Sequence, residues 1–346
     1  MGRIKVGITV GDTNGIGIEV VLKSLEDSRM LDKITPVIYG PSRVVSFHKK
    51  ELGQNTSYQK IKDANEAKGN KIFLLCTNDE DVRVDFGSAT NESGKEAFNS
   101  LKSAVSDLAG AKIDVLVTAP INKKNIQSQG FEFPGHTEYL TSYSNADDSL
   151  MFMVYNTLRV GVATNHVPLN EVSKHLTKDV IVSKLKLMDQ SLKRDFSIAR
   201  PRIAVLGLNP HAGENGVIGE EESSVIIPAI ETVSKEGVLA FGPYASDGLF
   251  GSGNYRKFDA ILAMYHDQGL TPFKAMAGGE GVNFTAGLPI VRTSPDHGTA
   301  FEIAGKNEAN PDSFRNAIYL AVDVFKSRRN IKELTSNPLE PQTQKR

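Results

Sequence analysis

The stretch "VGITVGDTNGIGIEV", Val6–Val20, joins an apolar β-branched run to an amphipathic segment through a loop with three glycines. This pattern predicts a buried strand, a turn and a helix. The glycines are spaced G-x-x-x-G-x-G, which reverses the G-x-G-x-x-G order of dinucleotide-binding loops. We therefore expect the glycines to shape the turn. The loop is also a candidate to line a ligand cleft, because sheets of this kind bind ligands at the carboxyl ends of their strands, and a Rossmann-type dinucleotide site is the alternative.

The same unit of strand, loop and helix recurs along the chain. The other strand-like runs are "TPVIY", "KIFLL", "KIDVLVTA", "LRVGVATN", "PRIAVLGLN" and "FDAILAMY". Helical patterns occupy 91–111 and 177–196. Runs that are apolar almost throughout are typical of strands buried on both faces, so an α/β fold with a mainly parallel sheet is predicted.

A length of 346 residues favours two domains. Glycine-rich stretches at 130–135 and 277–281 would allow the middle of the chain to form a lobe of its own. We predict a terminal lobe from residues 1–130 plus 280–346, and a middle lobe from residues 131–279.

Composition excludes several classes of protein. The 40 lysines and arginines nearly balance the 41 aspartates and glutamates, so no basic field favours nucleic acid. One cysteine, Cys76, rules out an internal disulfide and suits a reducing compartment. The sequence contains no signal peptide pattern and no apolar run long enough for a membrane span. We expect a cytoplasmic protein without nucleic-acid or membrane partners.

Three of the seven histidines follow strand-like runs directly: His166, His211 and His266. The carboxyl ends of parallel strands lie along one edge of a sheet, so these imidazoles can converge, within one chain or across a dimer. Three neutral imidazoles suit a divalent transition metal with open coordination positions. Zinc, cobalt, manganese and magnesium remain alternatives, and the competing interpretation is three unrelated loop histidines.

Two carboxylates lie near these histidines in the sequence. Asp267 follows His266, and Asp247 stands in the glycine-rich "GPYASDGLF". Each is a candidate to orient a metal-bound histidine or to act as general base. Helix capping or a turn is the alternative role for each.

A second group of polar residues suits a phosphate. The stretch "FPGHTEYL" places His136 and Thr137 where a helix begins, and backbone N–H groups there bind anions. Lys274, Asn283 and Arg292 fall in loops around later strand-like runs. An ammonium, an amide and a guanidinium together suit a phosphate monoester.

Six motifs resemble the 4-hydroxythreonine-4-phosphate dehydrogenase family of pyridoxal phosphate biosynthesis. They are "GDTNGIGIE", "TAPINK", "FPGHTEYL", "LNPHAGENGVIGEEE", "YHDQGLTPFKA" and "GVNFTAGLPIVRTSPDHGTAFEIAGKNEANPDSF". The chain departs from the family pattern at Thr13, Asn14 and Ile18, which leaves the glycines intact. The resemblance implies a homodimer with the fold of isocitrate and isopropylmalate dehydrogenases. That fold has two α/β/α lobes around a central cleft and is not a Rossmann fold.

The resemblance also implies roles for individual residues. It makes His166, His211 and His266 the metal ligands, supplied across two subunits at an interfacial active site. It makes His136, Thr137, Lys274, Asn283 and Arg292 substrate contacts. It assigns NAD, or NADP, to the loop at 297–311, through Gly298, Ala300, Glu302, Gly305 and Asn307. Lys123 of "TAPINK" lies near the cleft in an undefined role.

The activity so implied is metal-dependent, NAD(P)-linked oxidation of 4-phosphooxy-L-threonine in pyridoxine 5'-phosphate biosynthesis. The resulting 2-amino-3-oxo acid phosphate loses carbon dioxide to give 3-amino-2-oxopropyl phosphate. We expect Asp247 or Asp267 to be the base that removes the hydroxyl proton in the oxidation. One alternative is oxidative decarboxylation of threonate or erythronate 4-phosphate. Alternatives of other classes are a phosphotransacetylase-like acyltransferase and a silent sensor of a metabolite phosphate.

Overall fold

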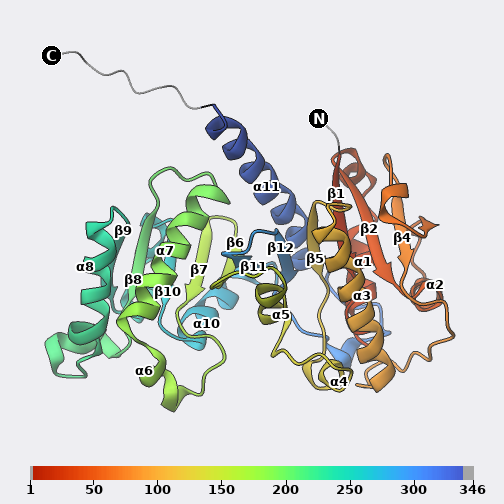
Figure 1. The fold of residues 1–346 in the computed structure, drawn as a ribbon. Helices are drawn as coiled ribbons and strands as arrows, with labels where there is room; N and C mark the ends of the chain where they lie inside the picture. The colour runs from red at the N-terminus through yellow and green to blue at the C-terminus, as the bar shows by residue number, and fades with distance from the viewer. Residues whose placement is uncertain (1–2, 338–346) are drawn as a thin grey trace.

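The chain folds around one sheet of twelve strands, in the order β3-β4-β2-β1-β5-β12-β11-β6-β7-β10-β8-β9 (Figure 1). The computed structural model describes residues 3–337. The strands are β1 (Ile4–Thr9), β2 (Ile34–Gly40), β3 (Tyr58–Ile61), β4 (Ile72–Cys76), β5 (Val115–Thr118), β6 (Leu150–Tyr155), β7 (Leu158–Val162), β8 (Arg202–Leu206), β9 (Leu239–Tyr244), β10 (Ala260–Ala263), β11 (Val282–Ala286) and β12 (Arg292–Pro295).

Helices cover both faces of this sheet. They are α1 (Gly17–Ser24), α2 (Ser42–Glu51), α3 (Asn91–Ala109), α4 (Lys123–Gln127), α5 (His136–Tyr143), α6 (Val172–His175), α7 (Lys178–Arg194), α8 (Ile227–Lys235), α9 (Ser246–Gly251), α10 (His266–Ala277) and α11 (Asp312–Thr335). In β5, Val115 and Val117 join the apolar cluster that contains α1 and α11, whereas Leu116 joins the cluster that contains α3. The α/β class, the seven strand-like runs and the two long helical patterns are confirmed.

The middle of the sheet is antiparallel, which the sequence patterns did not indicate. β11 runs antiparallel to both β6 and β12, and β6 forms a hairpin with β7. The remaining neighbours are parallel pairs. Figure 1 shows β1, β2, β4 and β5 on one side of this centre and β7 to β10 on the other. One continuous sheet runs through both predicted lobes, so the strand order does not mark where one lobe ends and the other begins. The lobe boundaries stay a prediction.

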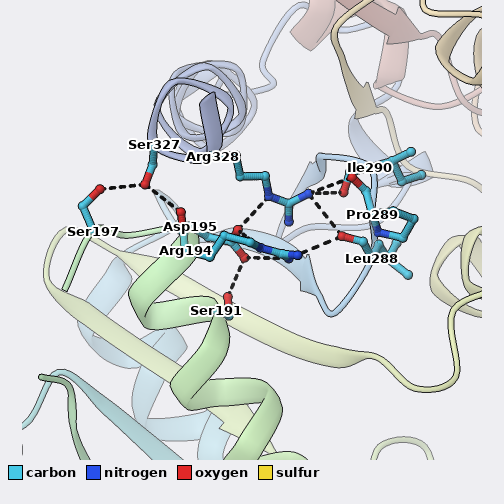
Figure 2. Close-up of polar contacts among 9 residues, drawn as sticks. All are labelled: Ser191, Arg194, Asp195, Ser197, Leu288, Pro289, Ile290, Ser327 and Arg328. Atoms are coloured by element: carbon cyan, nitrogen blue, oxygen red, sulfur yellow. Dashed lines mark hydrogen bonds and ion pairs between the residues drawn. The ribbon is translucent and has the colours of Figure 1, made fainter. Parts of the chain in front are cut away.

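A buried polar network around Asp195 ties the two sides together (Figure 2). The Asp195 carboxylate accepts hydrogen bonds from Nε of Arg328 at 2.7 Å, Nε of Arg194 at 2.9 Å and the Ser191 hydroxyl at 2.7 Å. Nη1 of Arg328 also donates to three successive carbonyl oxygens, those of residues 288–290, at 3.1, 3.1 and 2.9 Å. The network therefore fixes α7, α11 and the β11–β12 loop to one another.

Within residues 3–337, no helix is both long and apolar enough to cross a bilayer.

Candidate functional site

A cavity of about 290 Å³ opens where the antiparallel centre meets the two sides of the sheet. Its walls come from the segment after β5, the first turns of α5 and α10, and the strands β6, β11 and β12. All five residues predicted to bind the substrate line it: His136, Thr137, Lys274, Asn283 and Arg292. Segments more than 150 residues apart in the sequence thus meet at one place, although the roles of these residues stay predictions.

Arg292 is a buried cation without a carboxylate partner in the described part of the chain. It is 3% exposed, and its guanidinium donates to Thr118 Oγ1 at 3.1 and 2.7 Å and to Thr285 Oγ1 at 3.2 Å. Burial lowers the pKa of Arg292 to about 10, against the opposing effect of Glu138. A buried charge costs free energy unless it is paired. This end of the cavity is therefore suited to an anion.

Two uncharged groups lie at the same cavity. Burial, then the charges of Arg292 and Lys123, hold the pKa of His136 well below its usual range, so its ring is neutral. Its Nε2 and the Oδ1 atom of Asn283 are buried and have no hydrogen-bond partner within residues 3–337. Buried polar atoms are normally paired. A ligand in the cavity can supply the missing partners.

His166 and His266 form the other end of the cavity, with ring centroids 5.5 Å apart. They follow the neighbouring parallel strands β7 and β10. His266 Nδ1 is 2.6 Å from the Asp267 carboxylate, an arrangement that typically orients metal-bound histidines. Burial, Lys123 and His266 lower the pKa of His166, which favours the neutral form that binds metals.

His211 does not line this cavity. It follows β8, the strand next to β10, and lies in an exposed turn with a φ of 53°. The described residues of a single chain hold no group of three or more His, Cys, Asp or Glu side chains able to bind a metal. Supply of the third ligand by a second subunit stays a prediction.

The two proposed general bases lie outside the cavity walls. Asp267 is 81% exposed and Asp247, in α9, is also exposed. The carboxylates that do line the cavity are Glu138 and Asp296. Burial raises the pKa of Asp296. The sequence patterns did not single out either carboxylate, although each adjoins a candidate residue: Glu138 follows Thr137, and Asp296 precedes the 297–311 loop.

The glycine-rich loop after β1 supports the cavity and is absent from its walls. Gly11 has a φ of 67°, and Asp12 donates its backbone N–H to Pro120 O at 2.9 Å. The N–H of Ile16 donates to Thr299 O at 3.0 Å. The loop thus braces the cavity wall at Pro120 and the start of the predicted nucleotide loop, while direct lining of the cleft is not observed.

Of the residues assigned to NAD, only Gly298 borders the cavity. Ala300, Gly305 and Asn307 have positive φ angles, and a Cβ at Gly305 would collide with the Phe86 ring. Glu302 lies in a short helical turn between them. The loop is therefore a fixed, irregular backbone surface beside the cavity, and its binding role stays a prediction.

Comparison with known proteins identifies the family. The sequence profile described as "Pyridoxal phosphate biosynthetic protein PdxA" matches residues 32–321. A 4-hydroxythreonine-4-phosphate dehydrogenase of Bacteroides thetaiotaomicron is 50% identical, over 98% of this chain and 94% of the relative. A relative from Oceanobacillus iheyensis, itself provisionally named as a D-threonate 4-phosphate dehydrogenase, is 36% identical over 92% of this chain and 97% of its own length.

The crystal structure of 4-hydroxythreonine-4-phosphate dehydrogenase from Klebsiella pneumoniae has the same fold, with a TM-score of 0.82. Its sequence is 32% identical, and the comparison covers 94% of this chain and 98% of that structure. The family profile spans every residue that lines the cavity. The chain therefore belongs to the PdxA family of pyridoxal phosphate biosynthetic proteins.

Proposed function

We propose that the chain oxidises 4-phosphooxy-L-threonine with NAD or NADP, and that the resulting 3-oxo acid loses carbon dioxide. The observation that carries the proposal is Arg292, a buried guanidinium without a carboxylate, in the same cavity as the His166–His266 pair. A phosphate at Arg292 would supply the missing counter-charge. The rest of a four-carbon substrate would then extend toward the histidines.

The two groups that the family implies are a divalent metal and NAD or NADP, and the histidine pair suits the metal. Two imidazoles, one of them bonded to a carboxylate, are an appropriate partial donor set for a divalent cation. His211 of the partner subunit would complete the set of three ligands, and a cation held there would polarise the substrate hydroxyl as a Lewis acid. NAD on the 297–311 loop would accept the hydride. Asp247 and Asp267, which lie outside the cavity walls of a single chain, remain our candidates for the base that accepts the hydroxyl proton.

The chain's own residues would bind and align the substrate. Arg292, Lys274 and Asn283 would hold the phosphate away from the carbon that reacts, so that binding energy is used for alignment. The neutral His136 can donate one hydrogen bond to a phosphate oxygen without adding charge.

We further propose a homodimer that brings His211 to the partner's cavity. The turn that carries His211 also exposes Val217, at 80%, and Ile218, at 38%. Two exposed apolar side chains beside a predicted metal ligand favour contact with another protein surface. Light scattering of the purified chain would test this, and a monomer at micromolar concentration would contradict it.

A second substrate is favoured by one relative, the Oceanobacillus protein named for D-threonate 4-phosphate. That compound replaces the amino group with a hydroxyl and retains the phosphate and the carboxylate. The test is NADH formation at 340 nm with each substrate in turn.

Chelation of metals, or His211→Ala, should abolish turnover but leave NAD binding unchanged. Full activity of either preparation would refute the metal role.

A further inference from the structure

Residues 85–90, which lie between β4 and α3, pack closely against the 297–311 loop. A Cβ at Gly87 would lie 3.0 Å from the backbone oxygen of Phe301, and a Cβ at Gly305 would lie 2.8 Å from the Phe86 ring. The two glycines have φ angles of 81° and 79°. Each segment therefore has a glycine where the other approaches, and a larger residue there would push the two apart.

The side chain of Asn14, in the glycine-rich loop after β1, holds the 85–90 segment. Asn14 is fully buried, at 0% exposure. Its amide nitrogen donates to Ser88 O at 2.9 Å and to Thr90 Oγ1 at 3.2 Å. Its Oδ1 accepts the backbone N–H of Asp85 at 2.9 Å, and its backbone oxygen accepts the N–H of Gly87 at 3.0 Å. Because a carbonyl only accepts and a backbone N–H only donates, these partners fix the orientation of the amide.

The residues on either side of this asparagine contact the same two segments. The Thr13 carbonyl accepts a hydrogen bond from Nε2 of His48 at 2.8 Å, and the His48 ring packs edge-on against Phe86, with centroids 4.9 Å apart. On the other side, a Cβ at Gly15 would lie 2.8 Å from the Thr299 oxygen. The glycine-rich loop, the 85–90 segment and the 297–311 loop therefore form one interlocked unit.

We propose that Asn14 is a positioning residue for the nucleotide, because it docks the 85–90 segment against the 297–311 loop and so keeps that loop in its binding shape. The inference rests on the proposed function, which assigns NAD or NADP to this loop. Positive φ angles at Ala300 and Asn307 persist only where the surroundings enforce them. Without the asparagine the loop would populate other conformations, and nucleotide affinity would fall with the fraction that is competent to bind.

The test compares Asn14→Ala with Asn78→Ala in the metal-loaded enzyme. Asn78 is the matched control, because it is an asparagine between β4 and α3 whose side chain also makes structural hydrogen bonds. Its amide donates to Glu96 Oε1 at 2.9 Å and its Oδ1 accepts the N–H of Glu80 at 2.9 Å. Those partners lie outside both the glycine-rich loop and the 297–311 loop. The fluorescence of NADH gives its Kd, steady-state rates give kcat and both KM values, and urea unfolding shows that each variant is folded.

Asn14→Ala should raise the Kd for NADH and the KM for NAD by about 10-fold, which is about the net contribution of one lost hydrogen bond. The kcat and the KM for the phosphorylated substrate should stay near the wild-type values, and Asn78→Ala should change none of the four. An unchanged Kd in Asn14→Ala would overturn the proposal, as would an equal rise in both KM values or an equal rise of the Kd in Asn78→Ala.

A second variant and a second measurement keep the test decisive if Asn14→Ala does not fold. Gly87→Ala changes an exposed position, and its Cβ would press on the Phe301 oxygen, so it should raise the Kd for NADH selectively as well. Hydrogen exchange without nucleotide should be faster in the 297–311 loop of either folded variant than in the wild-type chain, and equal exchange would overturn the proposal. Failure of the wild-type chain to bind NADH would instead refute the proposed function.

Discussion

Replacement of Arg292 by methionine would test whether the cavity is built for a phosphate. In the described structure the guanidinium is 3% exposed and is bonded to two threonine hydroxyls, with no carboxylate in ion-pair range. Removal of one partner of a buried charge pair costs about 2–5 kcal/mol, which corresponds to a loss of about 30-fold to several thousand-fold in affinity. We expect the KM for the phosphorylated substrate to rise by that factor, with little change in the KM for NAD.

Thermal unfolding gives a second measurement that does not depend on turnover. A ligand at 100 times its Kd stabilises the folded state by about 2.7 kcal/mol. Inorganic phosphate or the substrate should therefore raise the Tm of the wild-type chain and leave that of Arg292→Met unchanged. Without ligand the variant should lose little stability, because an unpaired buried cation is itself costly.

Arg159→Met is the matched control, since Arg159 is also largely buried, packs over the Phe196 ring and lies outside the cavity. It should retain both the KM and the phosphate-dependent Tm shift. Equal increases in the KM for substrate and for NAD, or a normal Tm shift in Arg292→Met, would refute the assignment of Arg292 to the phosphate.

Three further changes test the framework around the site. Burial lowers the pKa of His48 to about 4. Between pH 7 and 5 this residue therefore gains a proton only in the unfolded state, and the free energy of unfolding should fall by about 2 kcal/mol because of it. Urea unfolding at pH 7 and 5 should show that loss, and His48→Gln should lack it; an equal loss in the variant would contradict the assignment. Asp195→Asn leaves Arg328 buried without its counter-ion and should cost about 3–5 kcal/mol in urea unfolding, so an unchanged midpoint would count against the network. Gly11→Ala places a Cβ against the Pro120 carbonyl at positive φ, and it should lower Tm and raise the substrate KM together; wild-type values would show that the loop is not a brace.

Seven of the twelve strands and the mainly parallel pairing were predictable from sequence, whereas the antiparallel centre was not. A run such as "KIDVLVTA" is apolar at successive positions because β5 is buried on both faces. Direction depends on which strands become neighbours, and nothing in the local pattern of β11 records that it lies antiparallel to β6 and β12. The antiparallel centre is therefore a property of the tertiary arrangement.

The site was predictable to the extent that its residues follow strands or begin helices. His166, His266 and Arg292 reach one cavity for this reason. The same rule locates an edge of the sheet but not the direction of a side chain, which is why Asp267 adjoins the site and still points to solvent at 81% exposure. Proximity in sequence therefore did not indicate which carboxylates line the cavity.

The turn that carries His211 has a strained backbone. Five successive residues, His211 to Asn215, have positive φ angles between 43° and 78°, and four of them are not glycine. Each such non-glycine residue costs about 1–2 kcal/mol. The buried Glu222 carboxylate offsets part of this cost by accepting the backbone N–H groups of Leu208 and Asn209 at 2.7 and 2.8 Å. A strained turn that is held this firmly, with a histidine that does not line its own chain's cavity, would suit a ligand supplied to a neighbouring subunit, and that role stays a prediction.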